Sequence, residues 1–204
     1  MRPREMEKFI AHCEKYFEQK TEMVLHPSNK DGLHIDILRF EPTEKYPFWK
    51  LVTMGASDYK MPKQKVTLGD RNEYMMFVHP DEDLRAKDTL SWYGDILASI
   101  AMYPANTKTA VSYAHSIEWG EPEPGCDMEG AFLEMPQAIE STDILRCKLG
   151  PFKTVVCLQV VTLTRAEIDK LIEIGPHRFS DYLYPDEEDA LPHFFCEKKR
   201  TDRF

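Results

Sequence analysis

Two short apolar runs in the first third of the chain limit its fold more than any other feature. HIDILRF at residues 34–40 and FWKLVTM at residues 48–54 are rich in β-branched and aromatic side chains, which is typical of strands. The break between them, EPTEKYP, has Pro42 and Pro47 near its ends, where a missing backbone donor does least harm to a strand pair. The pattern predicts an antiparallel hairpin.

The rest of the chain contains further runs with the composition of strands and several with the periodicity of helices. The additional strands are predicted at residues 73–80, 108–120, 130–136 and 154–164. The helices are predicted at residues 3–20, about 90–104, 164–174 and, for one short helix, within 175–195.

Two local signals place helix ends. Pro104 is expected to stop the second helix, which should pack across the sheet. Thr164 and Glu167 have the spacing of a capping box, in which each side chain bonds the backbone N–H of the other residue. That pair is expected to start the third helix.

We therefore expect an α+β fold, with a mixed, mostly antiparallel sheet packed by helices. The length of 204 residues suits a single domain, and we expect it to comprise residues 1–204 with a charged tail at 196–204. Regular alternation of strands and helices is absent, which argues against a doubly wound nucleotide-binding fold.

The charge balance and the cysteines restrict the class of protein. A formal net charge of −9 disfavours a nucleic-acid binder and favours a basic partner. The longest apolar stretch, residues 154–163, is about half the length of a membrane-spanning helix, and no secretory signal is apparent. The five cysteines form no Cys-x-x-Cys pair, so we expect neither a disulfide framework nor a zinc knuckle, and a cytoplasmic location.

Residues with catalytic potential are few. His34 and Asp36 are two apart on a predicted strand and share one face, but no third metal ligand lies nearby in the sequence, so we expect no metal site. Ser57 follows a strand as a nucleophile would, yet Tyr59 replaces the second glycine of that motif. We expect Gly55 to permit a sharp turn, with Ser57 and Asp58 bonding the loop backbone.

Acidic residues gather in three segments that lack a basic residue. Residues 118–129 hold five carboxylates, and DED at 81–83 and DEED at 186–189 are similar. Each is a solvated surface by default, but together they predict an acidic face that steers a basic protein partner. Trp119 would supply an aromatic anchor of the kind found at interface centres.

The hairpin runs, the segment RNEYMMFVHP, the helix LSWYGDILASIAMYP and the segment KTVVCLQVVTLTRAEIDKLIEIG together resemble the suppressor of fused domain family. The resemblance extends over about residues 32–175. It implies an α+β domain that holds another protein and has no known catalysis. It also places the peptide-contacting strand within residues 112–119, where His115 occupies a position expected to be acidic in animal members.

Compact members of that family with one lobe resemble bacterial immunity proteins. We therefore predict a non-enzymatic immunity protein without cofactor, which binds a cognate, basic toxin domain such as a nuclease. The expected contact residues are Asp36, Asp58, His115, Glu118, Trp119, Glu121 and Glu123.

Two alternatives remain open. The first is an adaptor that sequesters an endogenous signalling or transcription protein through strand addition. The second is a metal-assisted hydrolase that uses His34, Asp36 and a histidine from a neighbouring strand end.

Overall fold

A computed structural model describes residues 1–21, 23–26, 32–65, 67–122, 124–185 and 193–200. The strands are β1 Met23–Leu25, β2 Asp36–Phe40, β3 Trp49–Met54, β4 Asn72–Val78, β5 Ser116–Glu118, β6 Gly130–Glu134, β7 Arg146–Gly150 and β8 Lys153–Leu163. The α-helices are α1 Pro3–Phe17, α2 Lys87–Thr107, α3 Arg165–Ile174 and α4 Pro176–Leu183, and the 3-10 helices are η1 Ala56–Asp58 and η2 Thr142–Leu145. Within these described ranges, no helix is both long and apolar enough to cross a membrane.

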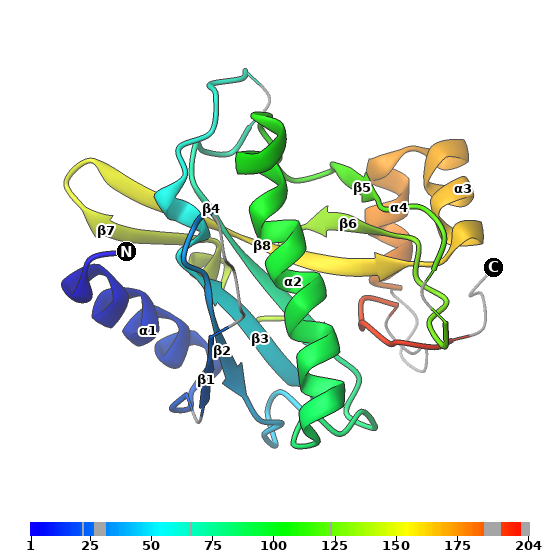
Figure 1. The fold of residues 1–204 in the computed structure, drawn as a ribbon, viewed down its shortest axis with the longest axis horizontal. Helices are drawn as coiled ribbons and strands as arrows, with labels where there is room; N and C mark the ends of the chain where they lie inside the picture. The colour runs from blue at the N-terminus through cyan, green and yellow to red at the C-terminus, as the bar shows by residue number, and fades with distance from the viewer. Residues whose placement is uncertain (22, 27–31, 66, 123, 186–192, 201–204) are drawn as a thin grey trace.

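The strands form one mixed sheet of eight strands (Figure 1). Their order is β1-β2-β3-β4-β8-β6-β5, and β7 pairs with β8 beyond this path. The β4–β8 pair is parallel, and the other ladders are antiparallel. The predicted fold class and the predicted hairpin of β2 and β3 are confirmed.

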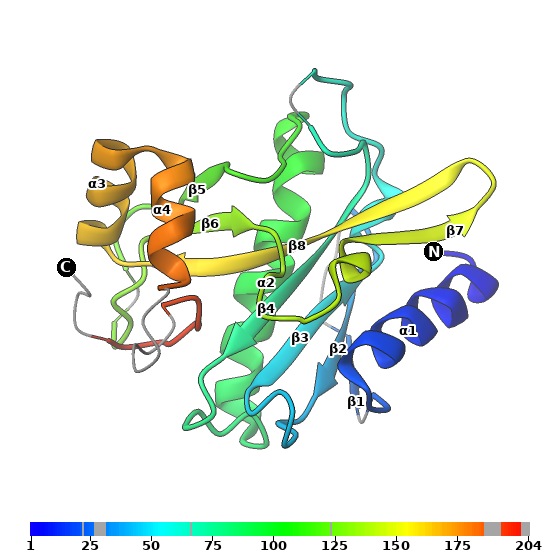
Figure 2. The same cartoon turned by 180° about the vertical axis from the view of Figure 1, so that it is seen from behind.

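Helices cover both faces of the sheet. In Figure 1 helix α2 crosses the near face, and in Figure 2, seen from behind, α1 and α4 lie on the opposite face. Successive residues of β2 enter different cores: Ile37 packs in the cluster that includes the buried face of α2, and Leu38 packs in the cluster with α1, α3 and α4. Because both faces are covered, the central strands β2, β3 and β4 are buried along their whole length.

The second helix is longer than predicted. It continues through Pro104 to Thr107, so the prediction that Pro104 ends it is wrong. Pro104 is itself buried with the apolar face of the helix, and we attribute the extra turn to this packing, which offsets the backbone hydrogen bond that proline cannot donate.

The predicted set of strands needs three corrections. The predicted strand at 108–120 is reduced to β5, because Ala114 adopts a left-handed conformation with φ 66° and turns the chain. Strands β1 and β7 were not predicted at all. Each is short, and each is held by pairing with a longer neighbour, β2 and β8 respectively, rather than by a strong pattern of its own.

The turn after β3 encloses a buried carboxylate. Glu73 of β4 has no exposed surface and accepts hydrogen bonds from the backbone N–H groups of Gly55 at 2.9 Å, Ala56 at 3.2 Å and Ser57 at 2.9 Å. The Thr53 hydroxyl adds a fourth bond at 2.7 Å. Burial raises the pKa of Glu73, and these hydrogen bonds oppose that shift.

Gly55 is required at this turn, as the sequence predicted. Its φ is 127°, and a Cβ atom would lie 2.1 Å from the carbonyl oxygen of His34. The role of Ser57 differs from the predicted one, because its backbone N–H donates a hydrogen bond to the Glu73 carboxylate. Asp58 bonds the loop through its backbone N–H, which donates to the Gly55 carbonyl at 3.1 Å, while its carboxylate contacts Lys153 at 2.8 Å and the N-terminal amino group.

Replacing Gly55 by alanine should therefore lower the free energy of unfolding by about 3 kcal/mol or more, because the substitution adds both backbone strain and a clash with rigid backbone. Urea denaturation would measure the change. Gly150→Ala is the matched control, since no atom lies within 4 Å of its added Cβ. Equal stabilities of the two variants would contradict this account of the turn.

Candidate functional site

The outer edge of β5, which no other described strand pairs, is the candidate partner-binding site. It lies within the segment where the family resemblance placed a peptide-contacting strand. In the sheet β5 follows β6 at one end of the strand order (Figure 1). His115 accepts a hydrogen bond from Leu133 N–H at 2.8 Å, and Trp119 donates its backbone N–H to Glu129 at 3.0 Å. These two bonds fix the ladder on both sides of β5.

Hydrogen bonding alternates along an antiparallel strand pair. Because residues 115 and 119 bond β6, the register places Ile117 opposite Ala131 as the bonded pair between them. The backbone N–H and C=O groups of Ser116 and Glu118 therefore point away from β6. Ser116 and Glu118 thus each present a backbone donor and a backbone acceptor at the sheet edge.

The side chains around this edge are partly engaged within the chain. Trp119 is half-buried against the α2-side core, and its indole N–H donates to the Met128 carbonyl at 3.0 Å. His115 is also half-buried. Trp119 therefore stabilises the edge from within, and its ring offers a partner only part of its surface.

The acidic segment at 118–129 is partly neutralised. Arg165, the first residue of α3, contacts Glu118 at 3.1 Å, Asp169 at 3.0 Å and Glu129 at 3.8 Å. Glu121 is exposed. Glu123 lies outside the described residues, so its predicted role as a partner contact stays a prediction.

A basic segment of the chain itself lies against two of the acidic segments. The Lys198 backbone N–H approaches Glu82 at 3.5 Å, and its carbonyl accepts from Asp127 N–H at 3.1 Å. Arg200 N–H donates to the Asp127 carboxylate at 3.2 Å. The acidic segments at 81–83 and 118–129 thus converge, and the chain's own C-terminal residues occupy part of the face between them. The third acidic segment, 186–189, lies outside the described residues.

The C-terminal segment is anchored by a buried ion pair that the sequence did not reveal. The Arg200 guanidinium bonds both carboxylate oxygens of Glu167, and the two side chains are only 4% and 2% exposed. Arg200 also donates to the Thr162 carbonyl at 2.7 Å. Glu167 completes the predicted capping box with Thr164, which is confirmed, so one carboxylate holds both a helix start and the chain end.

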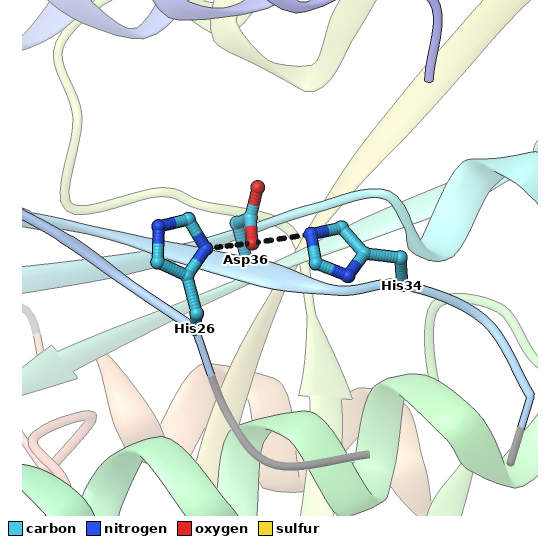
Figure 3. Close-up of side chains that lie close together, drawn as sticks. All are labelled: His26, His34 and Asp36. Atoms are coloured by element: carbon cyan, nitrogen blue, oxygen red, sulfur yellow. Dashed lines mark hydrogen bonds and ion pairs between the residues drawn. The ribbon is translucent and has the colours of Figure 1, made fainter. Parts of the chain in front are cut away.

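Two predicted contact residues offer a partner little free carboxylate. Asp36 is 2% exposed and its side chain accepts from His26 and His34 (Figure 3). Asp58 is occupied by Lys153 and the N-terminal amino group. Their predicted role as partner contacts stays a prediction: the Asp36 carboxylate is buried and paired, and the Asp58 carboxylate is paired but 37% exposed. The histidine that joins His34 and Asp36 is His26, which the sequence reasoning missed because β1 was not predicted.

A buried lysine is a further feature that sequence reasoning missed. Lys50 of β3 has no exposed surface, and its ammonium group lies 5.6–5.9 Å from the ring centres of Phe17, Tyr46 and Phe48. It donates to the Gln19 side chain at 3.0 Å. Desolvation lowers the pKa of Lys50 to about 8.

The fold and the β5 edge can now be compared with those of known proteins. Residues 31–185 match the family described as suppressor of fused protein (SUFU). The chain belongs to the suppressor of fused family. The match contains β2 to α4 and so includes the β5 edge. No curated protein matches the chain in sequence.

Solved structures of this family share the fold. A structure of a Sufu–Fu complex superposes with a TM-score of 0.67 at 15% identity, covering 97% of this chain and 91% of that one. The structure of Drosophila Suppressor of Fused superposes with a TM-score of 0.64 at 16% identity. The match covers 90% of this chain and 47% of the Drosophila chain, so this chain spans about half of that protein. The structure of a putative SUFU homolog from Neisseria gonorrhoeae superposes with a TM-score of 0.63 at 11% identity, and the match covers 87% of each of the two chains.

Arg200→Ala should lower the free energy of unfolding by about 3 kcal/mol, because it leaves the Glu167 carboxylate buried without its cation. The matched control is Lys199→Ala, an exposed neighbour, which should change stability by less than about 0.5 kcal/mol. Thermal or urea unfolding measures both. If the two variants were equally stable, the C-terminal segment would not be anchored as described.

The buried Lys50 predicts an unusual pH dependence of the free energy of unfolding. Its pKa in the folded protein, about 8, is below the ordinary value near 10.4, so the unfolded chain binds more protons between these values. The free energy of unfolding should therefore rise from pH 8 to about pH 10, by up to about 3 kcal/mol. Lys50→Met should lack this component of the rise. Parallel pH profiles for the wild type and the variant would refute the assignment.

Proposed function

We propose that this chain is a protein-binding module rather than an enzyme, and that its partner adds a strand to the outer edge of β5. The observation that carries the proposal is the pair of outward-facing backbone groups at Ser116 and Glu118. An extended peptide can bond such an edge through its own backbone, while neighbouring side chains select its sequence. One of the similar structures is a Sufu–Fu complex, so a protein with this fold binds another protein.

The turn at residues 55–58 argues against the serine-hydrolase chemistry that its sequence suggests. An oxyanion hole needs backbone N–H groups directed toward a substrate. Here the N–H groups of Gly55, Ala56 and Ser57 are directed to the buried carboxylate of Glu73. The turn is therefore part of the scaffold.

The charge of the chain supports a basic partner. The formal net charge is −9, and the acidic segments at 81–83 and 118–129 converge where Glu82 and Asp127 accept the backbone N–H groups of Lys198 and Arg200. The specific function that we propose is an immunity protein that occludes a basic toxin domain one to one. An adaptor for an endogenous signalling or transcription protein would use the same edge and differ in its partner.

The first experiment is affinity capture from the source lysate at moderate salt, followed by mass spectrometry. A stoichiometric toxin domain would support the immunity function, and a signalling or transcription protein would support the adaptor instead. Recovery of no protein partner would count against both.

Strand addition at β5 is then tested with Ser116→Pro. Proline at this position removes an outward backbone donor and leaves the bonds from β5 to β6 in place. The variant should bind the captured partner at least tenfold more weakly, with its unfolding temperature almost unchanged. Ser116→Ala is the matched control, because it keeps the N–H and should bind within twofold of the wild type. Equal affinities for the two variants, measured by calorimetry, would exclude this edge.

A further inference from the structure

Three side chains at the beginning of β2 converge on one point (Figure 3). His26 Nδ1 lies 2.6 Å and His34 Nε2 lies 2.9 Å from the same oxygen, Oδ1 of Asp36. One nitrogen from each ring and one carboxylate oxygen of Asp36 all lie within 4.8 Å of one another. The two rings are 65% and 77% exposed, whereas the Asp36 side chain is 3% exposed.

The backbone holds these residues in position. The β1–β2 ladder pairs Leu25 with Ile37, so the next step of the antiparallel register places His26 opposite Asp36. On the other side, the carbonyl of His34 packs directly against Gly55, where a Cβ would lie 2.1 Å away. The site therefore joins the edge ladder to the turn that encloses Glu73.

We propose that His26, His34 and Asp36 form a binding site for a divalent transition-metal ion such as Zn²⁺. Imidazole nitrogens and a carboxylate oxygen are a donor set that zinc takes, and two nitrogen donors disfavour Mg²⁺ and Ca²⁺. Ligand distances of about 2.0–2.2 Å in a tetrahedral site require donor atoms roughly 3.3 Å apart. The two His–Asp contacts, at 2.6 and 2.9 Å, need to open by less than about 1 Å, and the two ring nitrogens, which lie within 4.8 Å of each other, need to approach by up to about 1.5 Å. The exposed rings have room for both movements.

The three donors leave one tetrahedral position open. The histidine rings face solvent, so this position is accessible to water or to a side chain of another protein. An open fourth position distinguishes such a site from a closed structural zinc site, which has four protein ligands. The site lies at the β1 end of the sheet, opposite the β5 edge in the strand order, and the proposal is independent of strand addition.

The competing explanation is a metal-free cluster in which both histidines donate to the buried carboxylate. That cluster would satisfy Asp36 equally well. The two explanations differ in a measurable property, because only a metal site takes up one equivalent of ion with spectroscopic signs of nitrogen and oxygen ligands.

The test uses the full chain without a histidine tag, stripped with chelator and titrated with Zn²⁺ by calorimetry and with Co²⁺ by visible absorption. We expect one equivalent of each ion and Co²⁺ bands of a four-coordinate site without sulfur charge-transfer absorption. His34→Gln should weaken Zn²⁺ binding at least tenfold. This variant should fold, since the ring is largely exposed, and circular dichroism would verify it.

His79→Gln is the matched control, because His79 lies on the chain after β4 and contacts Asp81 instead. It should bind Zn²⁺ as the wild type does. Absence of saturable one-to-one binding, or equal affinity of the His34 and His79 variants, would overturn the proposal in favour of the metal-free cluster.

Discussion

The buried carboxylate of Glu73 is the interaction on which the arrangement of this sheet most depends. It bonds three successive backbone N–H groups at the end of β3 and the hydroxyl of Thr53, so it connects β4 to the turn that leaves β3. An uncompensated carboxylate at this depth would be costly. Its four donors make the 3-10 turn a structural part of the sheet, and the same turn positions the carbonyl of His34 through Gly55.

The opposite end of the structure is organised by a second carboxylate. Glu167 caps α3 and bonds Arg200, while Cys196 pairs with the end of β4 by donating its N–H to Phe77 at 2.8 Å. The segment that the sequence predicted to be a charged tail is thus bound to the sheet as far as residue 200. This places the backbone of Lys198 and Arg200 between two acidic segments, whereas the Arg200 guanidinium pairs with Glu167 and Arg165 pairs with Glu118 and Glu129.

The parts predictable from sequence were those encoded by neighbours in the chain. The β2–β3 hairpin, the capping box at Thr164 and the α+β class follow from local patterns. Strands β1 and β7 depend on pairing with a longer strand, and Arg200 and His26 gain their partners only when distant segments meet. Of the predicted contact residues, Asp36 and Asp58 pair with groups of the fold itself, and His115, Glu118 and Trp119 lie on or beside β5. Their role as partner contacts stays a prediction.

The central functional claim is that a partner pairs with the outward groups of Ser116 and Glu118. Residue-resolved amide hydrogen exchange, on the free chain and on its complex with the captured partner, tests it most directly. The account predicts fast exchange at these two amides in the free chain and strong protection in the complex, while Ile117 is protected in both states. Unchanged exchange along β5, with new protection elsewhere, would contradict the claim.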